Sequence, residues 1–145
     1  MADAENHLIQ QLPKTVRQRF LERCEPFELV LSAELSERDK TLSHAYFPRH
    51  GFISLVIDVD SHPPLEVGMV GCESMLGSEL VLGLAKTPWR ALVLGLAKTP
   101  WRALVQGPGS SWRLGAQALR ECLSDMPALR DVVQASLLVR LHQQA

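Results

Sequence analysis

An alternation of apolar and polar residues in the middle of the chain constrains its fold more than any other feature. In the segment FISLVIDVD, at residues 52–60, one set of alternate positions is apolar: Ile53, Leu55, Ile57 and Val59. The opposing set is more mixed: Phe52, Ser54, Val56 and Asp58. This period of two predicts a half-buried β-strand. The same period marks two further predicted strands, one with Phe27, Leu29 and Leu31 and one with Leu65, Val67 and Met69.

Turn-forming residues separate these predicted strands. The sequence DSHPP at residues 60–64 predicts the turn of a hairpin. The sequence QGPG at residues 106–109 predicts a second turn, with a last strand at residues 111–114. Short strands broken by Gly and Pro favour an antiparallel sandwich or roll over alternating βαβ units.

Helical periodicity is confined to the two ends of the chain. It predicts a short helical turn between Asn6 and Pro13, a helix over residues 15–24 and a short helix over residues 117–123. Pro127 suits the first position of a long last helix over residues 127–145.

The apolar face of this last helix is too broad for a single contact. Five of its residues fall on a heptad-like seam: Ala128, Val132, Ala135, Val139 and His142. We therefore expect one side to contact the strand layer of its own domain and the seam to contact the same helix of a second subunit, forming a homodimer. A helix buried entirely in its own core has the same periodicity, so that alternative stays open.

Composition indicates one globular domain, residues 1–145. The chain is 46% hydrophobic and 21% charged, which suffices for a proper core. Its formal net charge is −1 and it has no basic run, so we expect no binding of nucleic acid through charge alone. The first residues are too polar for a signal peptide, and no apolar stretch approaches the roughly 18 residues of a membrane span. We expect a cytoplasmic protein without membrane contact.

The cysteines and histidines give no pattern of a metal or catalytic site. Three cysteines far apart disfavour a disulfide framework or a zinc site: Cys24, Cys72 and Cys122. The histidines are scattered without any His-x-His pair: His7, His44, His50, His62 and His142. No motif of a Ser or Cys nucleophile is present. We therefore expect no metal and no catalytic residue; a cupin-like metalloenzyme on a similar roll is the enzymatic alternative.

A tandem duplication is the second unusual feature. Residues 81–92 read VLGLAKTPWRAL, and residues 93–104 read the same. Architectural repeats have periods of roughly 20 to 50 residues and recur with drift, so this one is an insertion within a domain. Because each unit is largely apolar, we expect the extra copy to pack, either by lengthening a helix or by adding strand. Either copy can take the position that a single unit would hold.

Four segments together resemble the sensor domain of the Crp/Fnr family of bacterial transcription regulators: YFPRHGFISLVIDVD, LEVGMVGCESMLGSELVLG, PWRALVQGPGSSWRL and MPALRDVV. The resemblance covers the chain from about Asn6 onward. It implies a cyclic-nucleotide-binding-type β-roll, a double-stranded β-helix or jelly roll, over residues 26–114. Helices would flank it at residues 1–25 and 115–145, and the last helix would form a parallel homodimer. The family's helix-turn-helix follows that helix, so we expect no DNA-binding domain, and no DNA binding, in this chain alone.

In that family the stretch corresponding to residues 77–91 is the phosphate-binding cassette. Glycine lets backbone amides approach a phosphate, arginine pairs with it, and a carboxylate takes the ribose hydroxyl. The resemblance assigns these ligand-binding candidates: Gly77, Ser78, Glu79, Leu80, Arg90, Ala91, Arg102 and Ala103. The match is partial, because Ser78 follows Gly77 and the carboxylate of Glu79 comes one place late. That slip turns the side chain by about 100° at a helix start.

Two functions follow from the resemblance. The first is a ligand-sensing and dimerising domain, for which the family's cassette implies cyclic AMP or cyclic GMP; the sequence itself establishes no cofactor. The second is a degenerate, ligand-free β-roll that serves as a dimerisation or interaction module. A concave pocket where Gly77, Glu79 and one arginine converge would separate the first from the second.

Overall fold

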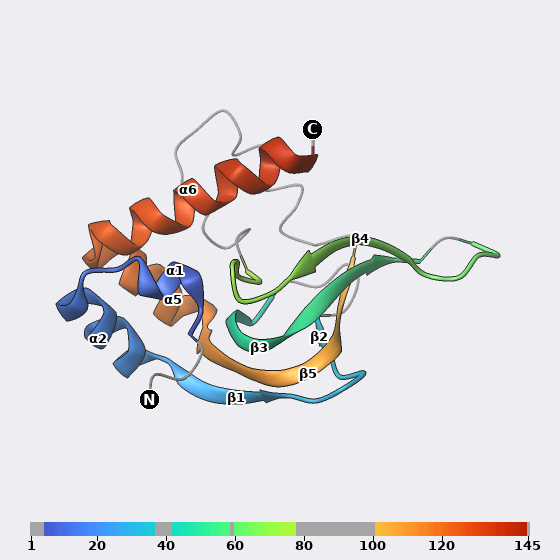
Figure 1. Cartoon of the computed structure of the whole chain (residues 1–145), viewed down its shortest axis with the longest axis horizontal. Helices are drawn as coiled ribbons and strands as arrows, with labels where there is room; N and C mark the ends of the chain where they lie inside the picture. Colours follow the sequence, from blue (N-terminus) through green and yellow to red (C-terminus); the bar gives the residue numbers. More distant parts are fainter. Residues whose placement is uncertain (1–4, 37–41, 59, 78–100, 145) are drawn as a thin grey trace.

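The computed structural model describes residues 5–36, 42–58, 60–77 and 101–144, with side chains as far as Leu137. The elements follow the order α1 (His7–Gln10), α2 (Lys14–Arg23), β1 (Glu25–Leu29), β2 (Glu34–Ser36), β3 (His44–Ile57), β4 (Leu65–Val70), β5 (Arg102–Gly115), α5 (Ala116–Asp125) and α6 (Pro127–Gln144). The helices gather at one end and the strands at the other (Figure 1). The predicted order of short helices, β region and long last helix is confirmed.

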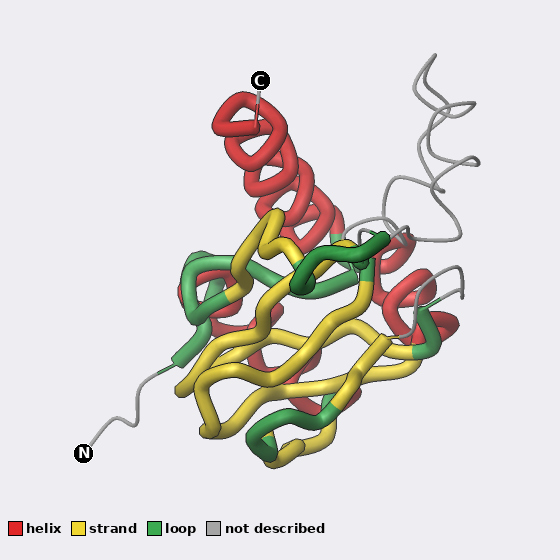
Figure 2. Tube along the Cα trace, turned by 90° about the vertical axis from the view of Figure 1, so that its right-hand side faces the viewer, coloured by secondary structure: helices red, strands yellow, loops and turns green. Residues whose placement is uncertain are grey.

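The described strands form one antiparallel sheet that curves into a roll. Its order is β1-β5-β3-β4, and β2 also pairs with β5. The strands β3 and β5 have 14 residues each and lie at the centre of the sheet. Figure 2 shows the curved layer of strands in yellow, with the helices in red outside it. The predicted antiparallel β-roll is confirmed.

Two hydrophobic cores hold this arrangement. The helix core lies between the helices and one face of the sheet, and includes Phe20, Phe47, Leu119, Leu129 and Val133. The roll core lies inside the curved sheet, and includes Leu29, Ile53, Leu55, Val70 and Val105. None of the helices in the described ranges combines the length and apolarity needed to cross a membrane.

The middle of β3 is buried on both faces, so the prediction of a half-buried strand is wrong there. Ile53 and Leu55 are in the roll core, yet Ser54 and Val56 on the opposite face are also at most 5% exposed. Ser54 meets its hydrogen-bonding need by donating its hydroxyl to Glu66 at 2.8 Å. Val59 lies outside the described residues.

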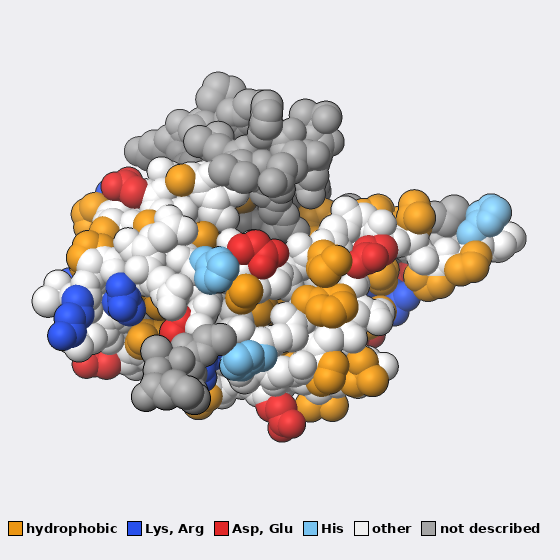
Figure 3. All heavy atoms as spheres, in the orientation of Figure 1, with side chains coloured by type: hydrophobic (Ala, Val, Ile, Leu, Met, Phe, Trp, Pro, Cys, Tyr) orange, Lys and Arg blue, Asp and Glu red, His pale blue; other side chains and the backbone are white. Residues whose placement is uncertain are grey.

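The predicted hairpin between β3 and β4 is confirmed, but its apolar residues do not share a face. Leu55 pairs with Gly68 and Val56 pairs with Glu66, which leaves Val67 unpaired as a β-bulge. The extra residue places Leu65 opposite Ile57 and Met69 opposite Ser54, on different faces of the sheet. Leu65 and Met69 are 58% and 57% exposed, on a hairpin that extends from the molecule (Figure 3).

The predicted turn at residues 106–109 is wrong, because β5 runs through it without interruption. The glycines there permit a close approach of β5 to β3, where the pairing of the two strands is irregular. A Cβ atom on Gly109 would lie 2.3 Å from the carbonyl oxygen of His50, and one on Gly107 would lie 2.4 Å from the ring of Phe52. The last strand predicted at residues 111–114 is thus the end of a longer one.

The first predicted strand is also shorter than expected. It ends at Leu29, and Leu31 lies 56% exposed in the turn to β2. Ser32 in this turn has φ 71°, a left-handed conformation that reverses the chain. The backbone amide of Ser32 donates to the carbonyl oxygen of Val105, which fixes the turn against β5.

Candidate functional site

Gly77 lies where the resemblance places the start of the cassette. Just before it, Leu76 forms a bridge to Tyr46 of β3, with two backbone hydrogen bonds of 2.9 Å. Gly77 itself is buried and has φ 115°, a conformation that favours glycine. The structure therefore brings the backbone of this glycine beside β3, in a conformation that would be strained for a residue with a side chain.

Most of the other cassette candidates lie outside the described residues. These are Ser78, Glu79, Leu80, Arg90 and Ala91, together with the first copy of the repeat and residues 93–100 of the second. The predicted packing of the extra copy lies there too. The convergence of Gly77, Glu79 and an arginine on one pocket stays a prediction.

Arg102 and Ala103, from the second copy, begin β5. Ala103 is fully buried in the roll core and pairs with Leu55. Arg102 forms a two-pronged ion pair with Asp58 at the end of β3: its Nε donates to Oδ2 and its Nη2 to Oδ1, both at 2.8 Å. A phosphate at this arginine must therefore compete with a carboxylate already held by both prongs.

A second charged cluster lies on β1, β3 and β5, and the sequence did not point to it. Arg113 of β5 lies opposite Glu25 of β1 on one side and opposite Tyr46 of β3 on the other. Its guanidinium lies 4.2 Å from the ring centre of Phe27, and its Nε donates to Oε1 of Glu25 at 2.8 Å. Burial raises the pKa of Tyr46, and the neighbouring Arg113 opposes that rise. These neighbours come from β1 and β3, so the register of the sheet brings them together with Arg113 of β5.

His44 is the next residue of this cluster along β3. Its Nδ1 lies 2.8 Å from the hydroxyl oxygen of Ser43, and its ring lies 6.3 Å from that of Tyr46. Burial, together with the positive charge of Arg113, holds the pKa of His44 below its ordinary value. His44 is therefore neutral at neutral pH and adds no second positive charge beside Arg113.

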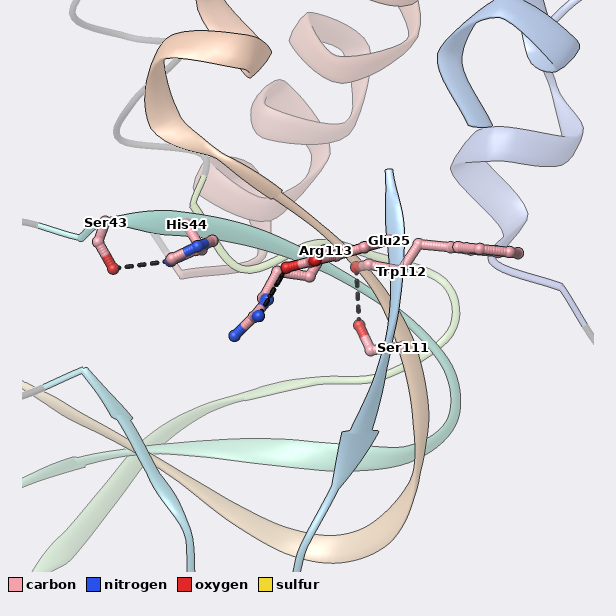
Figure 4. Close-up of polar contacts among 6 residues, drawn as sticks. All are labelled: Glu25, Ser43, His44, Ser111, Trp112 and Arg113. Carbon is pink, nitrogen blue, oxygen red and sulfur yellow. Dashed lines mark hydrogen bonds and ion pairs between the residues drawn. The ribbon is translucent and has the colours of Figure 1, made fainter. Parts of the chain in front are cut away.

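Alternate side chains of β5 point in opposite directions at this place. Trp112 points toward the N-terminal helices, whereas Arg113 points away from them (Figure 4). Trp112 packs against the helix core, and the neighbours of Arg113, Phe27 and Tyr46, belong to the roll core or pack against it. Arg113 therefore lies on the inner face of the roll.

Two of the three cysteines, Cys24 and Cys122, are unreactive thiols. Burial raises the pKa of the Cys24 thiol to about 12, and the neighbouring Cys122 adds to that rise. Burial also raises the pKa of Cys122. Both groups remain thiols at neutral pH and are poor nucleophiles. Among the residues that the structure describes, no three His, Cys, Asp or Glu side chains are placed to hold a metal ion.

Comparison with known proteins finds similarity in structure alone. No protein-family model and no curated protein matches the chain. The catabolite activator protein of Thermus thermophilus matches with a TM-score of 0.69 at 12% identity, over 94% of this chain and 58% of that one. The sensor domain of the transcriptional regulator DNR from Pseudomonas aeruginosa matches with a TM-score of 0.64 at 17% identity, over 95% and 85%.

A cyclic nucleotide-binding domain from Methylobacillus flagellatus matches with a TM-score of 0.68 at 12% identity, over 96% of this chain and 75% of that one. At such identities the likeness shows the fold, which is that of the cyclic-nucleotide-binding β-roll. The chain spans little more than half the length of the Thermus thermophilus protein.

Proposed function

We propose that this chain is the ligand-sensing and dimerising domain of a Crp/Fnr-type transcription regulator. The observation that carries the proposal is Gly77, a buried glycine with positive φ that follows the bridge to β3 in a cyclic-nucleotide-binding-type roll. This is where the family's cassette begins. Residues 1–145 would form one domain, in the cytoplasm, and DNA would be read by a separate helix-turn-helix.

The ligand of that cassette would be cyclic AMP or cyclic GMP. Calorimetric titration of the purified chain with both nucleotides tests this. A saturable heat at micromolar to millimolar nucleotide, lost in the variant Gly77→Val, is the expected result. The variant is chosen because valine is strained at positive φ. No heat at millimolar ligand would remove cyclic nucleotides from the proposal.

A specific observation favours the second function, a ligand-free dimerisation module. Arg102 already holds Asp58 with both prongs of its guanidinium. In addition, Ser78 stands directly after Gly77, where the family has the carboxylate. Dimerisation without nucleotide binding is the result expected for this function.

The last helix supports dimerisation under both functions. Leu129, Val133 and Leu137 of α6 are buried in the helix core. Ala128 and Val132 are only half-buried, and Ala135 is exposed. The predicted seam thus runs along the border of the buried face of α6, where Ala128 and Val132 pack in part against the helix core and Ala135 faces outward. The side chains of Val139 and His142 lie outside the described residues.

We expect the variant Ala135→Glu to weaken the dimer about tenfold or more, because it places two like charges at a shared seam. Sedimentation velocity over a concentration series measures this dissociation constant. Gln134→Glu is the matched control, since it adds the same charge at an exposed position well away from the seam. A monomer at all concentrations, or equal effects of the two variants, contradicts a dimer through this seam.

A further inference from the structure

The pairing of Arg113 with Glu25 leaves part of the arginine's binding capacity unused. Both Nε and Nη2 of Arg113 contact the same oxygen, Oε1 of Glu25, at 2.8 and 2.6 Å. Arg102, by comparison, engages both oxygens of Asp58. A guanidinium binds a carboxylate or phosphate most strongly through two parallel hydrogen bonds to two oxygens. A two-oxygen anion can therefore bind Arg113 better than Glu25 does.

Arg113 is held in place without Glu25. The ring of Phe27 lies under its guanidinium at 4.2 Å, and Tyr46, a residue only 4% exposed, lies opposite Arg113 on β3. Stacking on an aromatic ring beside a buried neighbour restricts an arginine before any anion arrives. An incoming anion then finds the guanidinium already in position.

Glu25 is suited to exchange with such an anion. Its side chain is 56% exposed, against 25% for that of Arg113. A carboxylate at this exposure gains little from the pair, because water solvates it almost as well. Its departure from Arg113 therefore costs little free energy.

We propose that Arg113, with Phe27 and Tyr46, forms a binding site for the carboxylate or phosphate group of a small organic anion, which exchanges with Glu25. The inference rests on the proposed ligand-sensing function, since it names the chemical group that the roll recognises. The site is distinct from Arg102 but close to the cassette, because Tyr46 is also the residue that bridges to Leu76 beside Gly77.

The test follows the Nε–H resonance of Arg113 and the backbone amide resonances of Phe27 and Tyr46 by ¹⁵N NMR while sodium phosphate, sodium benzoate or cyclic AMP is added. The backbone resonances report binding in the variants that lack Arg113. The variant Glu25→Gln removes the competing carboxylate, so we expect phosphate or benzoate to bind about three- to fivefold more tightly. The variants Arg113→Gln and Arg113→Lys should bind at least tenfold more weakly, because neither keeps the two-pronged charged donor. The tighter of the two probes identifies the group that is recognised.

Asp58→Asn and Arg102→Gln are the matched controls. The Arg102 side chain is 25% exposed, as is that of Arg113, and the two substitutions change the net charge by the same amounts. We expect less than a twofold effect of either on binding of phosphate or benzoate. Equal tightening by Asp58→Asn and Glu25→Gln overturns the proposal, as does the lack of any Arg113 shift in Glu25→Gln at millimolar anion.

The nucleotide arm separates this inference from the proposed function. Binding of cyclic AMP that needs Arg102 but not Arg113 overturns the inference and leaves the sensing function in place. Binding of phosphate or benzoate at Arg113 without any binding of cyclic AMP supports the inference and removes cyclic AMP from the proposed function.

Discussion

The variant Gly51→Ala is expected to lose about 3 kcal/mol of folding stability, from strain of about 1–2 kcal/mol at positive φ and overpacking of about 1–3 kcal/mol. Gly51 has φ 83°, and its Cβ would lie 2.2 Å from the carbonyl oxygen of Gly107 and 2.8 Å from that of Pro108. These are backbone atoms in the middle of β5, so no side-chain rotation relieves the clash. The backbones of β3 and β5 must therefore move apart at this place.

Urea unfolding followed by tryptophan fluorescence measures the effect. A domain of this size has a total stability of about 5–15 kcal/mol, so a large part of it is at stake. Gly115→Ala is the control, because no atom lies within 4 Å of its Cβ position. Gly115 is the N-cap of α5, so a loss below about 1 kcal/mol is expected there. Equal losses of stability in the two variants would show that the close approach of β3 and β5 at Gly51 does not determine the loss.

The same close approach of β3 and β5 explains why part of the fold was not predicted from the sequence. Gly107 and Gly109 beside Pro108 have the signature of a turn, and a turn was predicted. Their actual role depends on His50 and Phe52, which are more than 50 positions away in the sequence. No local pattern contains that contact. The bulge at Val67 is a second example, since its residues alternate as a regular strand would.

The candidate site was likewise predicted from the sequence only in part. The resemblance pointed to Gly77, and the structure gives it φ 115°, a conformation that favours glycine; its role in ligand binding stays a prediction. The cluster at Arg113 had no sequence signal, because an arginine in a strand is usually a solvated one. Its character comes from the register that sets Arg113 opposite both Glu25 and Tyr46. Sequence periodicity predicts strands, but it does not predict which residues lie opposite one another.

A second large effect is expected at Asn6, a fully buried residue that joins three parts of the chain. Its Oδ1 accepts from the amides of Leu8 and Ile9 at the start of α1, at 2.9 and 3.4 Å. Its Nδ2 donates to the carbonyl oxygens of Pro48 and Ser74, at 3.1 and 2.8 Å. Asn6→Ala removes a helix cap worth about 1 kcal/mol and leaves two carbonyls without this donor, at about 1 kcal/mol each. We expect a loss of about 3 kcal/mol.

Two further variants separate the cap from the bridge. Asn6→Ser keeps an acceptor for the amides of α1 but cannot reach both carbonyls, so its loss should lie between those of wild type and Asn6→Ala. Asn6→Asp also keeps the cap, but its carboxylate would face the carbonyl oxygens of Pro48 and Ser74. That repulsion, with burial, should raise the pKa of the introduced carboxyl in the folded state above its ordinary value of about 3.9.

The raised pKa gives this last variant a distinctive dependence on pH. A protonated carboxyl can donate one hydrogen bond to a carbonyl oxygen, so Asn6→Asp should come closest to wild type below about pH 4. Its deficit should then grow as pH rises through the higher pKa of the folded state. Urea unfolding of wild type and variant at a series of pH values measures the difference. Because Ser74 lies three residues before Gly77, a deficit that does not change with pH would mean that Asn6 caps α1 without bridging to the segment that leads into Gly77.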